Sequence, residues 1–175
     1  MIKLITVLLI ISSCSLVGLY KSMEIKERKT LLLDFKDMLL HLEREIGYFK
    51  EPLPDIFKKL SQSNSEAGGI TESKRFLQET LHIFQNQRDL NSAWSQAIEN
   101  IYGEKKLKKD DVAIFRRVGD FVGQSDLRGQ KSHFDMTNAM LDRQLEDADG
   151  ESKTKGQMFA KMGVSIGIVI AIVFI

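Results

Sequence analysis

Apolar stretches with almost no charge lie at both ends of this 175-residue chain, and they constrain its fold more than any other feature. Residues 4–20 contain no charged side chain, and as a helix they would extend roughly 25 Å. Residues 158–175 contain one charge, Lys161, whose long side chain can reach back to the interface. The hydrocarbon layer of a bilayer is about 30 Å thick. We therefore predict a transmembrane helix in 1–21, a helical domain in 22–157 and a second transmembrane helix in 158–175.

Basic residues flank the middle segment at both ends, and they predict the side of the membrane on which it lies. Only Lys3 lies beyond them, next to the N-terminus. Lysine and arginine are enriched in cytoplasmic loops, so this bias puts the middle segment in the cytoplasm and both termini on the far side. The flanking basic residues are Lys21, Lys26, Arg28, Lys29, Lys153, Lys155 and Lys161.

Residues 11–14 (Ile-Ser-Ser-Cys) suggest an alternative, because they look like the lipobox of an exported bacterial lipoprotein. Cleavage there would lipidate Cys14 and carry the whole domain out of the cytoplasm. However, the residues after Cys14 continue the apolar run, where a mature lipoprotein normally turns polar. We favour the two-span topology, and the mass of the mature N-terminus distinguishes it from a lipoprotein.

Small side chains recur every four residues in both predicted spans. They are Cys14 and Gly18 in the first span, and Gly163, Gly167 and Ala171 in the second. This spacing lets two membrane helices approach closely, so it would suit packing of the two spans or of copies in a homo-oligomer. Glycine is also common in membrane helices that make no such contact, and both interpretations stay open.

The middle segment carries apolar residues at helical spacing and lacks the alternation typical of strands. Pro52 and Pro54, the only prolines, separate a long first helix from a short second one, since proline disfavours helical geometry in the preceding residue. The first helix can continue unbroken from the first span. Further breaks at 61–69, 103–109 and 123–126 predict an all-α, antiparallel bundle of about six helices.

Helix starts and buried faces follow from residue type and spacing. We predict N-caps, whose side-chain oxygens accept backbone N–H groups, at Thr71, Asn91 or Ser92, Asp110 or Asp111, and Ser125 or Asp126. The predicted inner stripe of the first helix is Leu31, Phe35, Met38, Leu42, Ile46 and Phe49, and its outer face includes Asp34. The predicted inner face of the last helix before the second span is Gln130, Phe134, Thr137, Leu141 and Leu145.

No arrangement of residues in the sequence indicates catalysis. The single cysteine excludes an internal disulfide, and the three histidines fall on three different predicted helices. Residues 22–160 carry a net charge of −2, which gives them no reason to bind nucleic acid. The stretch 123–132 departs from a phosphate-binding loop, because Gln130 stands between its second glycine and Lys131. We expect no enzyme activity, no cofactor and no metal site.

Three motifs resemble the stage III sporulation protein AB family, and the resemblance covers essentially the whole chain. They are Glu-Ile-Gly-Tyr-Phe-Lys-Glu-Pro-Leu-Pro at 45–54, Ala-Trp at 93–94 with Ala97, and Val-Gly-Gln-Ser-Asp at 122–126 with Gln130. Gly47 is unusual inside the first motif. Phe121 and Val122 stand where the family often has a leucine before the glycine.

The resemblance implies a membrane subunit of the channel between mother cell and forespore, in the mother-cell membrane around the forespore. It also implies a fold like the cytoplasmic domain of the platform protein of type II secretion and type IV pilus systems. By that analogy the chain would be non-catalytic and would dock a cytosolic secretion-type ATPase onto the other channel subunits. A generic membrane-tethered scaffold or signalling module and an exported lipoprotein remain alternatives.

Two corners of the predicted bundle are candidates for partner contacts, because turns expose side chains on rigid supports. The first corner is acidic and stiffened by proline, and consists of Glu43, Glu45, Glu51, Pro52 and Pro54. The second corner is polar, and consists of Asp126, Arg128 and Gln130. Capping and turn geometry would explain these residues equally well.

Overall fold

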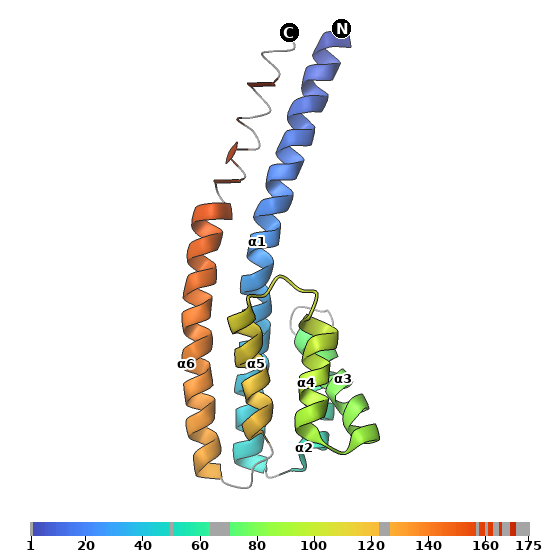
Figure 1. Cartoon of the computed structure of the whole chain (residues 1–175), viewed down its shortest axis with the longest axis vertical. Coiled ribbons are helices and arrows are strands. Elements are labelled where there is room, and N and C mark those ends of the chain that lie inside the picture. Colours follow the sequence, from blue (N-terminus) through green and yellow to red (C-terminus); the bar gives the residue numbers. More distant parts are fainter. Residues whose placement is uncertain are drawn as a thin grey trace. The chain divides into compact units, whose positions relative to one another are not determined.

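The computed structural model describes the backbone of residues 2–49, 51–63, 71–122 and 127–156, together with seven positions between 158 and 170 (Figure 1). The chain divides into two compact units. Residues 1–29 and 146–175 form the terminal unit, and residues 30–145 form the central unit. In the described residues every regular element is helical, which confirms the predicted all-α class.

The longest element is α1 (Ile2–Phe49), a single helix that contributes to both units. It confirms that the first helix continues unbroken from the apolar N-terminal stretch into the middle segment. It ends just before Pro52, as proline at that position requires. The other helix shared by both units is α6 (Leu127–Glu151), which continues as a short π-helix, Ser152–Gly156.

Among the residues that the structure describes, no helix is both long enough and apolar enough to cross a membrane. Much of the two predicted spans falls outside this description. Gly163, Gly167 and Ala171 are not described at all, and the side chains of residues 2–11 and of Cys14 are not described. The two transmembrane helices therefore stay predictions.

Four shorter helices complete the central unit: α2 (Leu53–Gln62), α3 (Glu72–Gln87), α4 (Leu90–Tyr102) and α5 (Lys109–Phe121). Neighbours in sequence are neighbours in space, since α2 packs on α3, α3 on α4, and α4 on α5. The described residues thus contain six α-helices, which agrees with the number expected from the sequence.

An aromatic cluster forms the core of the central unit, and each of α1 to α5 contributes to it. Phe35 of α1 stacks on Phe115 of α5 with ring centroids 3.7 Å apart. Phe76 of α3 meets the indole of Trp94 of α4 edge-on at 4.6 Å. The edge-on arrangement of Phe76 and Trp94 adds stability beyond the apolar area that it buries. The fully buried members are Phe35, Phe57, Phe76, Trp94, Tyr102 and Phe115.

The start of α2 confirms its predicted position, because Pro52 precedes the helix and Pro54 lies in its first turn. Thr71 also occupies the predicted N-cap position of α3, but its hydroxyl pairs with Ser73 Oγ at 2.9 Å. The carboxylate of Asp34 caps this helix instead, and accepts bonds from Ser73 N and Ser73 Oγ at 2.8 Å each. The prediction that Asp34 lies on the outer face of α1 was wrong.

Two other predicted N-caps were wrong by two or three residues. The N-cap of α4 is Asp89, which accepts from Ser92 N at 3.2 Å, and neither Asn91 nor Ser92. The N-cap of α5 is Lys108, whose backbone N–H donates to Asp111 Oδ2 at 2.8 Å. Asp111 therefore supports the helix start from within the first turn, where negative charge is favourable. The predicted caps Ser125 and Asp126 lie outside the described residues.

Candidate functional site

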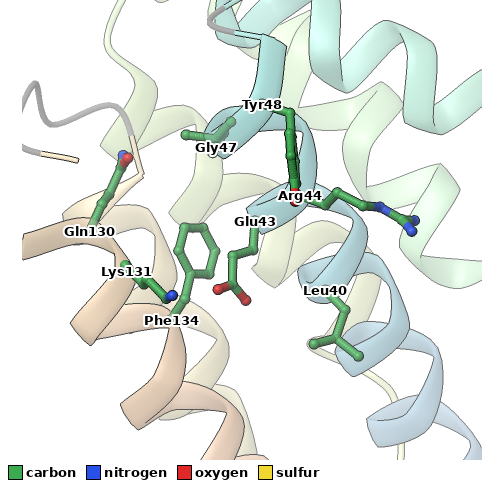
Figure 2. A pocket seen from close by; sticks show the side chains of 9 residues that line it. Leu40, Glu43, Arg44, Gly47, Tyr48, Gln130, Lys131 and Phe134 are labelled. Atoms are coloured by element: carbon green, nitrogen blue, oxygen red, sulfur yellow. The ribbon is translucent and has the colours of Figure 1, made fainter. Parts of the chain in front are cut away.

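A pocket of about 510 Å³ opens in the central unit between the C-terminal end of α1 and the first turns of α6 (Figure 2). It brings Glu43, from the first predicted corner, together with Gln130, from the second. These residues are far apart in sequence and share a site because α1 and α6 meet here. The lining residues are Leu40, Glu43, Arg44, Ile46, Gly47, Tyr48, Gln130, Lys131 and Phe134.

The apolar part of the pocket has a buried inner wall and an exposed rim. Phe134 forms the wall and is itself held by Phe121, whose ring it meets edge-on at 5.0 Å. At the rim, Leu40 is 45% exposed and Tyr48 is 80% exposed. Large exposed apolar side chains beside a hollow are typical of surfaces that another molecule covers.

Gly47 leaves the backbone of α1 bare within the pocket. Its backbone is helical, so no left-handed conformation demands a glycine here. A Cβ built at this position would meet nothing within 4 Å, so no close packing demands one either. The effect of the glycine is to leave space open beside Ile46 and Tyr48.

The polar part of the pocket combines an acid and an amide, Glu43 and Gln130, with two basic side chains, Arg44 and Lys131. Gln130 is only 4% exposed, and its Nε2 donates to the carbonyl of Phe121 at 3.1 Å. In the part of the chain that the structure describes, no donor reaches Gln130 Oε1, which is buried, and the same holds for Asn138 Oδ1 outside the lining. A buried acceptor without a donor costs free energy, so the fold keeps these amides at some expense of stability.

Glu43 adds a partly desolvated carboxylate to this group. Burial raises its pKa, and the charge of Asp135 raises it further. Lys131 and a 3.4 Å bond from Asn138 Nδ2 act in the opposite direction but do not cancel the shift. Figure 2 shows the Glu43 carboxylate between α1 and α6, with Phe134 and Lys131 close by and the Arg44 guanidinium extended away.

The other candidate contacts lie apart from the pocket. Glu45 is mostly covered and forms an ion pair with Lys59 Nζ at 2.6 Å, which ties α1 to α2. Glu51 and Pro52 are exposed in the turn, and the Pro52 carbonyl accepts from the backbone of α2. Asp126 and the Arg128 side chain lie outside the described residues. Of the candidates whose side chains the structure describes, Glu43 and Gln130 line the pocket.

The sequence predicted neither the apolar rim of the pocket nor the open space beside Gly47. Leu40 and Tyr48 fall off the buried stripe of α1, and Leu33 is a third large apolar side chain exposed on the part of α1 that belongs to the central unit. Apolar residues on a face that the helical spacing assigns to solvent were the available signal. Phe134 was predicted as a buried residue, and its place at a pocket wall depends on α1, which the spacing within α6 does not reveal.

In the terminal unit, the flanking basic residues make ion pairs with acids of α6. Arg28 is buried, and its Nη1 lies 3.0 Å from Asp147 and 3.2 Å from Glu151. Lys29 and Lys153 both lie 2.6 Å from Asp149, and their hydrogen bonds lower its pKa to about 2. Arg28 and Lys29, two of the residues that the sequence analysis interpreted as orientation signals, therefore also join α1 to α6.

Small residues allow a close approach in the same unit. Gly18 and Ser22 of α1 are buried, and a Cβ built on Gly156 would lie 3.4 Å from Ser22 Oγ. The packing predicted for Gly18 within a membrane remains a prediction.

Within the described residues, no three His, Cys, Asp or Glu side chains converge so that they could hold a metal ion. His133 instead stacks on Phe121 with ring centroids 5.3 Å apart. His41 and His82 are exposed. The described pocket thus has an apolar rim, charges of both signs and one buried amide oxygen without a donor.

The comparisons with known proteins that found a match agree on one family. No curated protein matches the chain. A solved structure of "Stage III sporulation protein AB (SpoIIIAB)" is 19% identical and superposes with a TM-score of 0.62, covering 72% of this chain and 96% of that one. At this identity the match shows that the fold is shared. The family model for stage III sporulation protein AB matches residues 3–175, and by this match along almost its whole length the chain belongs to that family.

Proposed function

We propose that the chain is a non-catalytic membrane subunit of the sporulation channel between mother cell and forespore, and that its central unit docks a cytosolic secretion-type ATPase. Membership of the stage III sporulation protein AB family supports a role in sporulation. The observation that carries docking is the pocket between α1 and α6, where Glu43 and Gln130 meet beside exposed apolar side chains.

The two apolar ends support the membrane part of the proposal. In this arrangement both ends cross the mother-cell membrane around the forespore, and the central unit faces the cytoplasm. Digestion of intact cells and of inverted vesicles with a protease tests this orientation. A central unit cleaved from outside intact cells, or an N-terminus that begins at a lipidated Cys14, would favour the exported lipoprotein instead.

Docking predicts that the chain and the ATPase bind directly. The full chain, purified in mild detergent, would be mixed with the secretion-type ATPase of the same organism, and their co-elution measured. An ATPase that does not bind the wild-type chain at all would overturn the proposed partner.

Leu40→Asp tests whether the pocket is the docking surface. It puts a charge at the rim, so we expect at least tenfold weaker binding. Leu33→Asp is the matched control, because Leu33 is exposed to a similar extent on the same helix, at 41%, and does not line the pocket. Equal binding by both variants would show that docking uses another surface.

A further inference from the structure

The buried face of α6 changes register where this helix becomes a π-helix. Phe134, Leu141 and Ala148 are buried at intervals of seven residues, which is about two turns of an α-helix. The same spacing puts Lys155 next on this face. Instead the Lys155 side chain is 57% exposed, and Gly156 is buried. The π-helix has therefore moved the buried face by one residue.

A π-helix shifts the register because each of its turns takes up more residues. Its hydrogen bonds join residues five apart, whereas those of an α-helix join residues four apart. One extra residue turns all later side chains by about 100° relative to an uninterrupted α-helix. π-helices are rare and occur mostly as single turns, often at functional sites. The contacts with α1 on either side of this one indicate its effect.

Ion pairs fix the rotation of α6 just before the π-helix. The guanidinium of Arg28 is buried and lies 3.0 Å from Asp147 and 3.2 Å from Glu151. The two acids are four residues apart, so they lie on one face of α6. Breaking a buried ion pair leaves an uncompensated charge, so this face is held toward α1.

At the other end of the π-helix, Gly156 lies against Ser22 of α1. A Cβ built on Gly156 would be 3.4 Å from Ser22 Oγ and 3.9 Å from the Ser22 carbonyl oxygen. A lysine at this place would have to bring its stem and ammonium group against Ser22, which is only 7% exposed. The π-helix therefore puts a glycine where an uninterrupted α-helix would put Lys155.

The same shift decides which face of the chain after Gly156 turns toward α1. Counted from Gly156 at helical spacing, this face carries an alanine and two glycines, at positions 160, 163 and 167. Without the shift it would carry three large side chains, at positions 159, 162 and 166. The Met162 side chain is 45% exposed, which agrees with the shifted register. Residues 160, 163 and 167 lie outside the described residues, so their place follows from the spacing alone.

We propose that the π-helix sets the pairing of the two predicted membrane spans, because it turns the small residues of the second span toward Cys14 and Gly18 of the same chain. Gly18 and Ser22 are already buried within one chain, so no second copy is needed to cover them. Small residues on facing helices let the two backbones approach closely. This inference rests on the two-span topology of the proposed function and is independent of ATPase docking.

The first test uses the single cysteine of the chain as a reporter. From Ser22 to Lys29 the partner moves back by seven residues, from Gly156 to Asp149, so we expect Cys14 at the level of residue 164. On oxidation of the full chain in mild detergent, Gly163→Cys should form a disulfide with Cys14 within one chain. Ser165→Cys is the matched control, because it lies as close to this level but is exposed and should react several-fold less.

Each other outcome of this test contradicts a stated part of the proposal. Equal yields from the two positions, or no disulfide from either, would overturn the register. A disulfide that links two copies would overturn pairing within one chain. The mass of the N-terminus is measured first, since a lipidated Cys14 would overturn the two-span topology itself.

The second test removes the π-helix. Deletion of Thr154, an exposed residue of this turn, lets an uninterrupted α-helix place Gly156 seven positions after Ala148. The Gly163→Cys chain should therefore keep its disulfide after this deletion. Insertion of one alanine after Thr154 is the control, and it should abolish the disulfide because it turns the segment by about a further 100°. Loss of the disulfide on deletion, or its survival on insertion, would overturn the role of the π-helix.

The third test changes the size of residue 156 in the Gly163→Cys chain. Gly156→Ala should be tolerated, whereas Gly156→Leu should meet Ser22 and lower the disulfide yield several-fold. Gly150→Leu is the matched control, because Gly150 is also helical and has nothing within 4 Å of a built Cβ. Circular dichroism should show all variants folded. An unchanged yield in Gly156→Leu would overturn the inference, whereas a chain that forms the expected disulfide but does not bind the ATPase would overturn docking alone.

Discussion

Replacement of glycine by alanine should have opposite effects on stability at Gly119 and at Gly47. A Cβ at position 119 would lie 2.7 Å from Trp94 Cδ1 and 2.8 Å from Trp94 Cγ. The indole cannot move aside freely, because it is fully buried and its Nε1 donates to the Phe115 carbonyl at 2.9 Å. At position 47 the added methyl would meet nothing within 4 Å.

The sizes of the competing free-energy terms decide whether alanine stabilises or destabilises the fold at each position. Overpacking of a well-filled core costs about 1–3 kcal/mol, and a buried indole N–H that loses its acceptor costs about 1–3 kcal/mol more. The gain in helix propensity from glycine to alanine is only about 1 kcal/mol. We therefore expect Gly119→Ala to lower the free energy of unfolding by about 1–5 kcal/mol, the lower end applying if the indole keeps part of its hydrogen bond. Gly47→Ala should leave it unchanged or raise it by up to about 1 kcal/mol.

The assay follows from the composition, since Trp94 is the only tryptophan of the chain. Its fluorescence during urea unfolding of the full chain in mild detergent reports directly on the core that Gly119 touches. A Gly119→Ala chain that unfolds at the same urea concentration as wild type, with unchanged emission, would refute the close contact between α4 and α5. A destabilised Gly47→Ala chain would refute the open position in the pocket.

Three further predictions use the same unfolding measurement. Asp34→Ala should cost about 1–2 kcal/mol, because it removes the cap of α3 at Ser73 N, whereas Asp37→Ala on the exposed face should change little; equal effects would argue against the cap. Tyr102→Phe should leave stability unchanged or raise it by about 1 kcal/mol, since the Tyr102 hydroxyl is buried without a partner among the described residues and burial raises its pKa well above the usual value; a large loss would reveal an unseen hydrogen bond. Two lysines lower the pKa of Asp149 to about 2, so its stabilising effect should be complete above about pH 4 and lost as the pH falls toward 2; Asp149→Asn should remove this part of the acid dependence, and an unchanged pH profile would contradict it.

The helices could be predicted from the sequence because their signals are local. Pro52 and Pro54 end one helix and start the next through their own backbone geometry, whatever the rest of the chain does. The apolar spacing of α6 likewise predicted that Gln130 and Thr137 are buried in spite of their polarity. The caps were less predictable, since a cap is chosen by geometry among several suitable neighbours. Asp89 lies just two residues before the predicted Asn91.

Features that depend on distant segments could not be predicted. Asp34 caps α3 through Ser73, which lies 39 residues later, so its own neighbours gave no sign of its role. The pocket likewise exists because α1 and α6 meet, and each predicted corner contained only one of its polar residues. The π-helix at Ser152–Gly156 also has no local sequence signal of the kind that proline gives.

The ion pairs of the terminal unit have a consequence for the order of events during biogenesis. A nascent chain is sorted across a membrane while its lysines and arginines are still free, and acidic residues count little at that stage. In the proposed topology, Arg28 and Lys29 would thus act first as retention signals. They would be engaged by Asp147 and Asp149 only when α6 has been synthesised. The same cations would then act twice, first to orient the chain in the membrane and later to pair with the acids of α6. A charge-neutral replacement of Arg28 would disturb both steps.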